Sequence, residues 1–251
     1  MKKIVKVHGN ERVDFIQRKG YKIIQNPEVF CFGIDAVLLA DFAKVKKKDR
    51  VLDIGTGTGI IPILMYARYE NESYVGIDIQ EDMVEMASRS VSMNNLENHI
   101  EMKHMDVKDI SNKYESGSFD VVTSNPPYMK GKAGLVNENE SKMISRHEIK
   151  CSLEDIIKNA AYLLKDRGKL YMIHRPNRLV DIIYLMRKYR LEPKRMQMIH
   201  PKEGKSPTMV LIEGIKYANP EIIVEPALYV YNKDGSYTDE IYQIYGSEEE
   251  D

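Results

Sequence analysis

Asn125-Pro126-Pro127-Tyr128 directly follows an apolar run over residues 119–124. The run predicts a buried strand, so these four residues stand just past its carboxyl end. The prolines lack N–H donors, Asn125 adds a side-chain acceptor, and Tyr128 adds an aromatic face. Such a group can accept both hydrogens of a planar amine, for example on a nucleobase, and stack on the ring that carries it. A rigid proline turn after a strand is the alternative interpretation.

A glycine-rich loop follows another predicted strand, at residues 51–54. Its glycines are Gly55, Gly57 and Gly59. A strand, a glycine-rich turn and a helix start are typical of a nucleotide site, although an ordinary turn has the same pattern. The spacing is G-x-G-x-G, which differs from the dinucleotide fingerprint. Asp53 before the first glycine would repel a pyrophosphate and suit an ammonium group, which favours S-adenosylmethionine over a dinucleotide.

Two further acids stand at predicted strand ends. Asp78 lies roughly 20 residues beyond the glycine loop, where an acid binds ribose hydroxyls in folds of this type. It could instead be the N-cap of the helix predicted over 81–94. Asp106 ends a strand predicted over 100–106. It could accept a hydrogen bond from an adenine amino group, or be a solvated loop acid.

Taken as a set, the glycine loop, the three acids and Asn-Pro-Pro-Tyr resemble the class I S-adenosylmethionine-dependent methyltransferases. The motif marks the subset that methylates planar nitrogens: adenine N6, guanine N2 or a glutamine amide. The segments 32–42 and 145–148 resemble the bacterial tRNA adenine-N6 methyltransferases that modify position 37, beside the anticodon of a valine tRNA. This resemblance covers nearly the whole chain.

The resemblance implies a Rossmann-like α/β fold. Its seven-stranded sheet would be mainly parallel, with helices on both faces and an antiparallel strand in the last pair. The implied catalytic residues are Asn125, Pro126, Pro127 and Tyr128. The implied residues for the cofactor, S-adenosylmethionine, are Asp35, Asp53, Gly55, Gly57, Gly59, Asp78, Ile79, Asp106 and Asn125. No metal is implied.

The net charge of −1 is low for an RNA-binding protein. The tail over 247–251 carries four of the acids, so the rest of the chain is about +3. Candidate RNA-contacting residues flank the catalytic motif: Lys130, Lys132, Arg146, His147 and Lys150. We expect them to contact phosphates of a tRNA anticodon loop, although a basic cluster can also be a solvated face.

The pattern of strands and helices predicts one methyltransferase domain over 31–217, an N-terminal extension over 1–30, and a C-terminal extension with an acidic tail over 218–251. A helix is predicted over 152–165, with Gly168 as its stop. The polar stretch 129–147 is predicted to be a mobile substrate loop.

No apolar run reaches the ~18 residues that a membrane span needs. The amino terminus has no adequate apolar stretch for a signal peptide. The two cysteines, Cys31 and Cys151, lack metal or redox spacing. We therefore expect a cytoplasmic enzyme, either a monomer or a dimer.

Three alternatives stay open at this stage. The amine could belong to DNA adenine, ribosomal RNA guanine or a release-factor glutamine. The chain could be a non-catalytic module that binds nucleotide or RNA, although such a module would not need Asn125 and Tyr128. A nicotinamide-dependent oxidoreductase is disfavoured by the glycine spacing and by Asp53.

Overall fold

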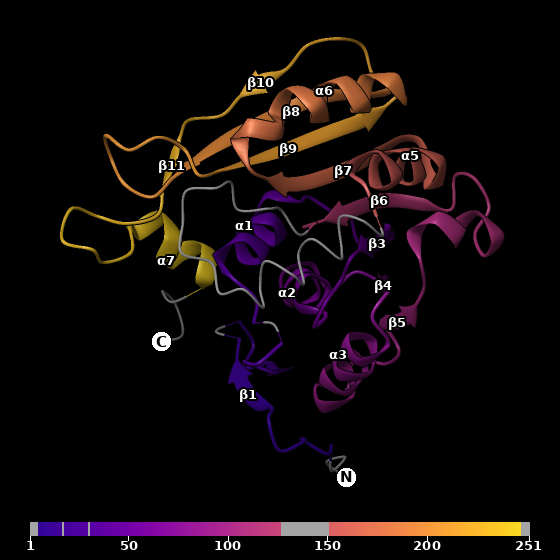
Figure 1. Ribbon diagram of the computed structural model, residues 1–251, viewed down its shortest axis with the longest axis vertical. Helices are drawn as coiled ribbons and strands as arrows, with labels where there is room; N and C mark the ends of the chain where they lie inside the picture. Colours follow the sequence, from indigo (N-terminus) through magenta and orange to yellow (C-terminus); the bar gives the residue numbers. More distant parts are fainter. Residues whose placement is uncertain (1–4, 17, 30, 127–150, 247–251) are drawn as a thin grey trace.

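The computed structural model describes residues 5–16, 18–29, 31–126 and 151–246, and a sheet flanked by helices forms its centre (Figure 1). The long strands are β3 (Arg50–Ile54), β4 (Ser73–Asp78), β5 (Ile100–His104), β6 (Phe119–Ser124), β7 (Leu164–His174), β8 (Leu191–His200) and β9 (Met209–Lys216). The α-helices are α1 (Ile34–Phe42), α2 (Ile60–Tyr69), α3 (Glu81–Met93), α5 (Leu153–Leu163), α6 (Leu179–Lys188) and α7 (Asp239–Tyr245). Two 3₁₀ helices are η1 (Val107–Asn112) and η2 (Pro176–Arg178).

The strand order is β8-β9-β7-β6-β3-β4-β5. The five strands from β7 to β5 are parallel, and β9 is antiparallel to both β7 and β8. This confirms the mainly parallel sheet with an antiparallel strand in the last pair. Two short strands, β10 (Ile223–Val224) and β11 (Leu228–Tyr229), also pair with β8, so the described sheet has nine strands and not the expected seven.

Helices cover both faces of the sheet, as expected (Figure 1). Successive side chains of a strand point to opposite faces. In β3, Val51 belongs to the core shared with α1, α2 and α7, whereas Leu52 belongs to the core shared with α5 and α6. Helix α2 is buried along nearly its whole length, and Pro62 is tolerated there because it lies in the first turn.

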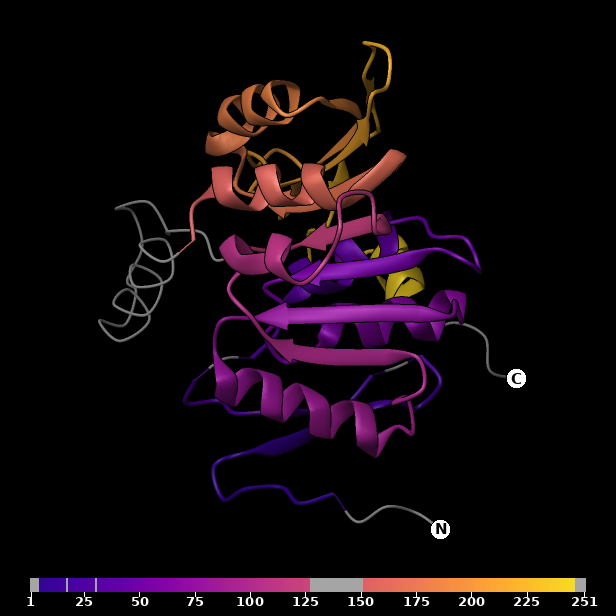
Figure 2. The same cartoon turned by 90° about the vertical axis from the view of Figure 1, so that its right-hand side faces the viewer.

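The carboxyl ends of the parallel strands gather at one edge of the sheet. In Figure 2 the purple and magenta strands point the same way. Strand β8 runs parallel to β7 because both are antiparallel to β9, so β8 ends and β9 begins at this same edge. Ligands of open α/β sheets bind outside such an edge.

The N-terminal part forms a hairpin of β1 (Arg12–Phe15) and β2 (Lys22–Gln25) that packs on α3. The Ile24 backbone N–H donates to Ser90 Oγ at 2.9 Å, and Ile24 packs with Met83 and Met86. The division of the chain into a domain and two extensions stays a prediction.

Two expectations about element ends were wrong. Helix α5 starts at Ser152 as its N-cap, with a capping box between Ser152 and Asp155, but it ends at Leu163 and not at Lys165. The chain enters β7 at once and bulges between the pairs Phe119–Leu164 and Val121–Lys169. A Cβ at Gly168 would lie 2.8 Å from the Lys165 carbonyl oxygen, so this glycine permits a close backbone approach and does not stop a helix.

Candidate active site

The glycine loop lies at the carboxyl end of β3 and is tied to β4. The backbone N–H groups of Gly55 and Thr56 both donate to the Ile77 carbonyl at 2.9 Å. Gly55, Gly57 and Gly59 have φ angles of 74°, 53° and 80°, a region that favours glycine. The sequence therefore forces the chain to turn sharply between β3 and α2.

Gly55 and Gly59, the first and last glycines of the loop, have different roles. A Cβ at Gly59 would lie 2.6 Å from Met102 Cε, so this residue permits close packing and does not line the cavity. Gly55 does line the cavity, and a Cβ there would meet no atom within 4 Å. The open space above Gly55 is available to a ligand that lies against the backbone.

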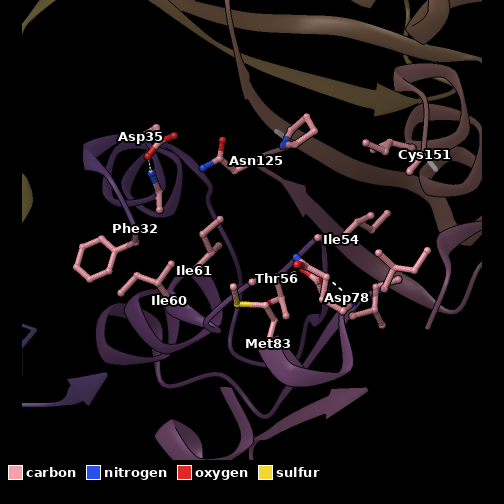
Figure 3. A pocket seen from close by; sticks show the side chains of 18 of the residues that line it. Phe32, Asp35, Ile54, Thr56, Ile60, Ile61, Asp78, Met83, Asn125 and Cys151 are labelled. Carbon is pink, nitrogen blue, oxygen red and sulfur yellow. Dashed lines mark hydrogen bonds between the residues drawn. The ribbon is translucent and has the colours of Figure 1, made fainter. Parts of the chain in front are cut away.

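Asp78 connects the loop to the start of α3. Its Oδ2 accepts the Gly57 N–H at 2.9 Å, and its Oδ1 accepts the Gln80 N–H at 2.9 Å. The N-cap of α3 is Gln80, so the alternative role of Asp78 as N-cap was wrong. Each carboxylate oxygen can accept a further hydrogen bond, and Asp78 lines the cavity (Figure 3).

Asp53 lies beneath the loop and not on the cavity wall. Its side chain is 1% exposed, and its Oδ1 accepts the Thr123 hydroxyl at 2.7 Å across the β3–β6 pair. Burial raises the pKa of Asp53 to about 6, although the Thr123 hydrogen bond opposes the shift. Any effect of Asp53 on a cationic ligand therefore acts through space and not by direct contact in this structure.

The expected strand ending in Asp106 is shorter than predicted, because β5 ends at His104. Asp106 is the N-cap of η1, and its Oδ1 accepts the Lys108 N–H at 2.9 Å. Asp106 also lines the cavity, next to a group of mainly apolar residues: Ile79, Met105, Val107, Leu153 and Ile156. An apolar wall with a carboxylate at its side suits a flat ring that carries an amino group.

Asn125 stands directly past β6, whose end is held to β3 by a hydrogen bond from Ser124 Oγ to the Ile54 carbonyl at 2.9 Å. Figure 3 shows Asn125 between Asp35 and Cys151. The Oδ1 atom of Asn125 is buried and accepts no hydrogen bond from any residue that the structure describes. Burying an acceptor without a hydrogen-bond donor costs free energy, so this atom is suited to accept a hydrogen bond from a ligand.

The structure brings most of the described candidates to one cavity of about 730 Å³. Lining it are Asp35, Gly55, Gly57, Ile79, Asp78, Asp106, Asn125 and Pro126. Asp35 lies in the first turn of α1, where its Oδ1 accepts the Ala36 N–H at 2.9 Å. Asp53 and Gly59 are described but lie off the cavity wall. The remaining candidates lie outside the described residues, as does the whole of the proposed substrate loop: Pro127, Tyr128, Lys130, Lys132, Arg146, His147 and Lys150.

The same cavity is also lined by three residues that the sequence analysis did not identify: His174, Arg175 and Met209. Two of them lie at the carboxyl end of β7, and Met209 opens β9 at the same edge. For His174 and Arg175, the position just past a predicted strand was the signal that could have found them. Burial lowers the pKa of His174 to about 4, helped by the nearby Arg178, so its imidazole is neutral at physiological pH.

Among the described residues, no three or more His, Cys, Asp or Glu side chains form a group that could hold a metal ion. No helix in the described ranges is long and apolar enough to cross a membrane.

Known proteins are similar to this chain in sequence and in fold. The methyltransferase small domain family matches residues 20–188. A tRNA1(Val) (adenine(37)-N6)-methyltransferase of Phocaeicola vulgatus is 30% identical over 80% of this chain and 86% of that protein. The protein of the same name from Tolumonas auensis is 26% identical over 90% of this chain and 92% of its own length.

Among solved structures, a predicted O-methyltransferase from Agrobacterium tumefaciens matches with a TM-score of 0.69 and 23% identity, over 84% of this chain and 95% of that one. A geranyl diphosphate C-methyltransferase from Streptomyces coelicolor, in complex with Mg²⁺, geranyl diphosphate and S-adenosyl-L-homocysteine, matches with a TM-score of 0.53 and 14% identity, over 73% of this chain and 77% of that one. At these identities the likeness concerns the fold alone.

Proposed function

We propose that this chain, which belongs to the methyltransferase small domain family and within it to the tRNA1(Val) (adenine(37)-N6)-methyltransferases, transfers a methyl group from S-adenosylmethionine to N6 of adenosine 37 in tRNA. The observation that carries the proposal is the buried Oδ1 of Asn125, an acceptor at the end of β6 with no donor among the described residues. An amino group on a planar ring supplies the missing donor.

The cavity fits S-adenosylmethionine by its own chemistry. Asp78 is positioned to accept hydrogen bonds from the ribose hydroxyls, and the space above Gly55 lets the ligand approach the backbone. The wall beside Asp106 suits the adenine ring, and Asp106 is an acceptor for its amino group. When bound, the cofactor supplies an electrophilic methyl group on a sulfonium.

The chain's own residues then position the substrate amine. The side-chain oxygen of Asn125 and the carbonyl of Pro126 accept the two N6 hydrogens, which directs the nitrogen lone pair toward the methyl group. Asn125 is neutral and therefore costs less to desolvate than a carboxylate would. No strong general base is required, because the nitrogen can lose its proton after transfer. Rate enhancement comes mainly from positioning and from fixed dipoles.

The target base must leave its stack to reach a cavity of this depth. An anticodon loop presents unstacked purines at low cost, which agrees with the substrate named for the relatives. Stacking of Tyr128 on the base remains part of the proposal. The proposal also includes phosphate contacts by the basic residues that follow the Asn-Pro-Pro-Tyr motif. It further includes a cytoplasmic location, where tRNA would be available.

Methyl transfer from labelled cofactor to purified tRNA, duplex DNA and a glutamine-bearing peptide tests the proposal. We expect label in tRNA alone, and N6-methyladenosine after nucleoside digestion. Label in DNA or peptide with none in tRNA would overturn the substrate assignment while keeping the methyltransferase activity.

A further inference from the structure

The sheet order divides the cavity into two halves. The ends of β3, β4 and β5 carry the glycine loop, Asp78 and Asp106, which suit the cofactor. The ends of β6 and β7 and the start of β9 carry Asn125, Arg175 and Met209. Since β6 lies beside β3, and β7 lies on the other side of β6, the second half is on the side of the cavity away from β4 and β5.

We propose that Arg175 binds a phosphodiester group adjoining the target nucleotide and so positions the flipped adenosine against Asn125. The inference rests on the proposed function, because it requires an RNA substrate in this half of the cavity. A base cannot enter the cavity without bringing its own sugar and flanking phosphates to the mouth.

Arg175 is the only lysine or arginine among the described residues that line the cavity. The other charged side chains on this lining are carboxylates: Asp78 and Asp106 lie at the ends of the cofactor strands, whereas Asp35 belongs to α1, which also packs on β7 and β9. A phosphate that approached those carboxylates would be repelled, whereas the guanidinium matches a phosphate with two parallel N–H donors. Among the described lining residues, Arg175 is therefore the group that attracts the RNA backbone.

The backbone and side chain of Arg175 are both held in place. Its backbone N–H donates to His174 Nδ1 at 2.8 Å, and its Nη1 donates to the Thr208 carbonyl at 3.0 Å. A guanidinium has five N–H donors, so the bond to Thr208 is compatible with phosphate binding. A side chain oriented in advance loses less entropy when a ligand binds.

Arg178 lies in the same short segment of the chain as Arg175. Its charge disfavours the protonated form of buried His174, and Asp181 opposes this effect. Arg178 Nε pairs with Asp181 Oδ2 at 2.8 Å, and Arg178 does not line the cavity. Arg178 is therefore a matched control: it has the same side chain three residues along the chain, outside the cavity.

The test uses a stem-loop RNA that carries the target adenosine. Single uncharged methylphosphonate linkages replace the phosphate on the 5′ side of the target, on its 3′ side, or two nucleotides away. Wild type, Arg175→Gln, Arg175→Lys and Arg178→Gln are compared by kcat/KM, and calorimetry measures S-adenosylmethionine affinity in each.

We expect Arg175→Gln to lower kcat/KM about 10–100-fold, the size of a lost charge-assisted hydrogen bond, with cofactor affinity unchanged. A methylphosphonate on one side of the target should lower wild-type kcat/KM by a similar factor and cause little further loss in Arg175→Gln. Arg175→Lys should recover part of the loss, and Arg178→Gln should stay within about threefold of wild type.

Equal sensitivity of wild type and Arg175→Gln to the methylphosphonates would overturn the inference. Should Arg175→Gln misfold, the wild-type linkage series decides: no effect of neutralising either flanking phosphate refutes the contact. Failure of wild type to methylate the unmodified RNA would instead refute the proposed function itself.

Discussion

At the scale of single residues, Asp78 is the strongest cofactor ligand candidate. Its two oxygens already hold the Gly57 and Gln80 N–H groups, so the carboxylate is fixed before a ribose arrives. We expect Asp78→Ala to weaken S-adenosylmethionine binding by about 1–3 kcal/mol through loss of charge-assisted hydrogen bonds. Calorimetry on the folded variant measures this, and unchanged affinity would remove Asp78 from the site.

Asn125 should separate chemistry from cofactor binding. Its unmatched Oδ1 is assigned to the substrate amine, and the residue only borders the cofactor half of the cavity. We expect Asn125→Ala to abolish methyl transfer in single-turnover assays while S-adenosylmethionine affinity stays close to that of wild type. Transfer at the wild-type rate would defeat the mechanism, and Asn125→Gln controls for the loss of the amide itself.

Asp53 should make cofactor affinity depend on pH. Burial raises its pKa from 3.8 to about 6, so the carboxyl is protonated below pH 6 and ionised above it. The cofactor's ammonium and sulfonium are positive and favour the ionised form. Affinity should therefore rise as pH increases through about 6, and Asp53→Asn should flatten this step. A pH series of calorimetric titrations in which both proteins behave alike would contradict the prediction.

At the scale of elements, an ion pair holds the N-terminal hairpin region to α3. Arg89 Nη2 lies 2.6 Å from Glu11 Oε1, and this bond with Arg89 lowers the pKa of Glu11 from 4.5 to about 2. The stabilisation is thus fully present above pH 4.5 and is lost as pH falls toward 2.

We expect Glu11→Gln to reduce the free energy of unfolding by about 1–3 kcal/mol at pH 7, and by less at pH 3.5. Urea titrations at the two pH values test this. Arg12→Gln is a suitable control, since Arg12 belongs to the same hairpin and its pair with Asp14 is more exposed. A Glu11→Gln effect that is the same at both pH values would argue against the ion pair as its source.

Element boundaries that depend on residues close in sequence could be predicted, whereas boundaries that depend on contacts between distant residues could not. The start of α5 followed from Ser152 and Asp155, which are close in sequence. Its end depends on Leu164 pairing with Phe119 in a neighbouring strand, which no local pattern reveals. Likewise, Gly168 looks like a helix stop in sequence but serves close packing against β6.

The same distinction between local and distant contacts applies to the residues of the site. The acids and glycines that follow strands could be predicted because the loop chemistry is local. Met209 reaches the cavity only because β9 inserts antiparallel between β7 and β8, which brings its first residue to the edge where the parallel strands end. Burial of Asp53 beneath the loop likewise depends on Thr123 of β6, 70 residues away.

At the level of the whole molecule, hydrogen bonds from two distant parts of the chain hold the end of α7. Arg18, after β1, and Arg68, in α2, donate to the Gln243 and Ile244 carbonyls near the end of α7. Arginine side chains at a helix carboxyl terminus satisfy carbonyls and complement the helix dipole. Because α7 also packs on α1, whose Asp35 lines the cavity, the C-terminal segment supports one wall of the site.

The proposed reaction of this protein is methylation of N6 of adenosine 37 in a tRNA. The most direct measurement is mass spectrometry of nucleosides at position 37, in tRNA from cells that lack the protein and from the same cells complemented with wild type or Asn125→Ala. We expect N6-methyladenosine to be missing from a tRNA in the deletion strain, to return with wild type, and to stay absent with Asn125→Ala. Unchanged N6-methyladenosine in the deletion strain, or full restoration by Asn125→Ala, would contradict it.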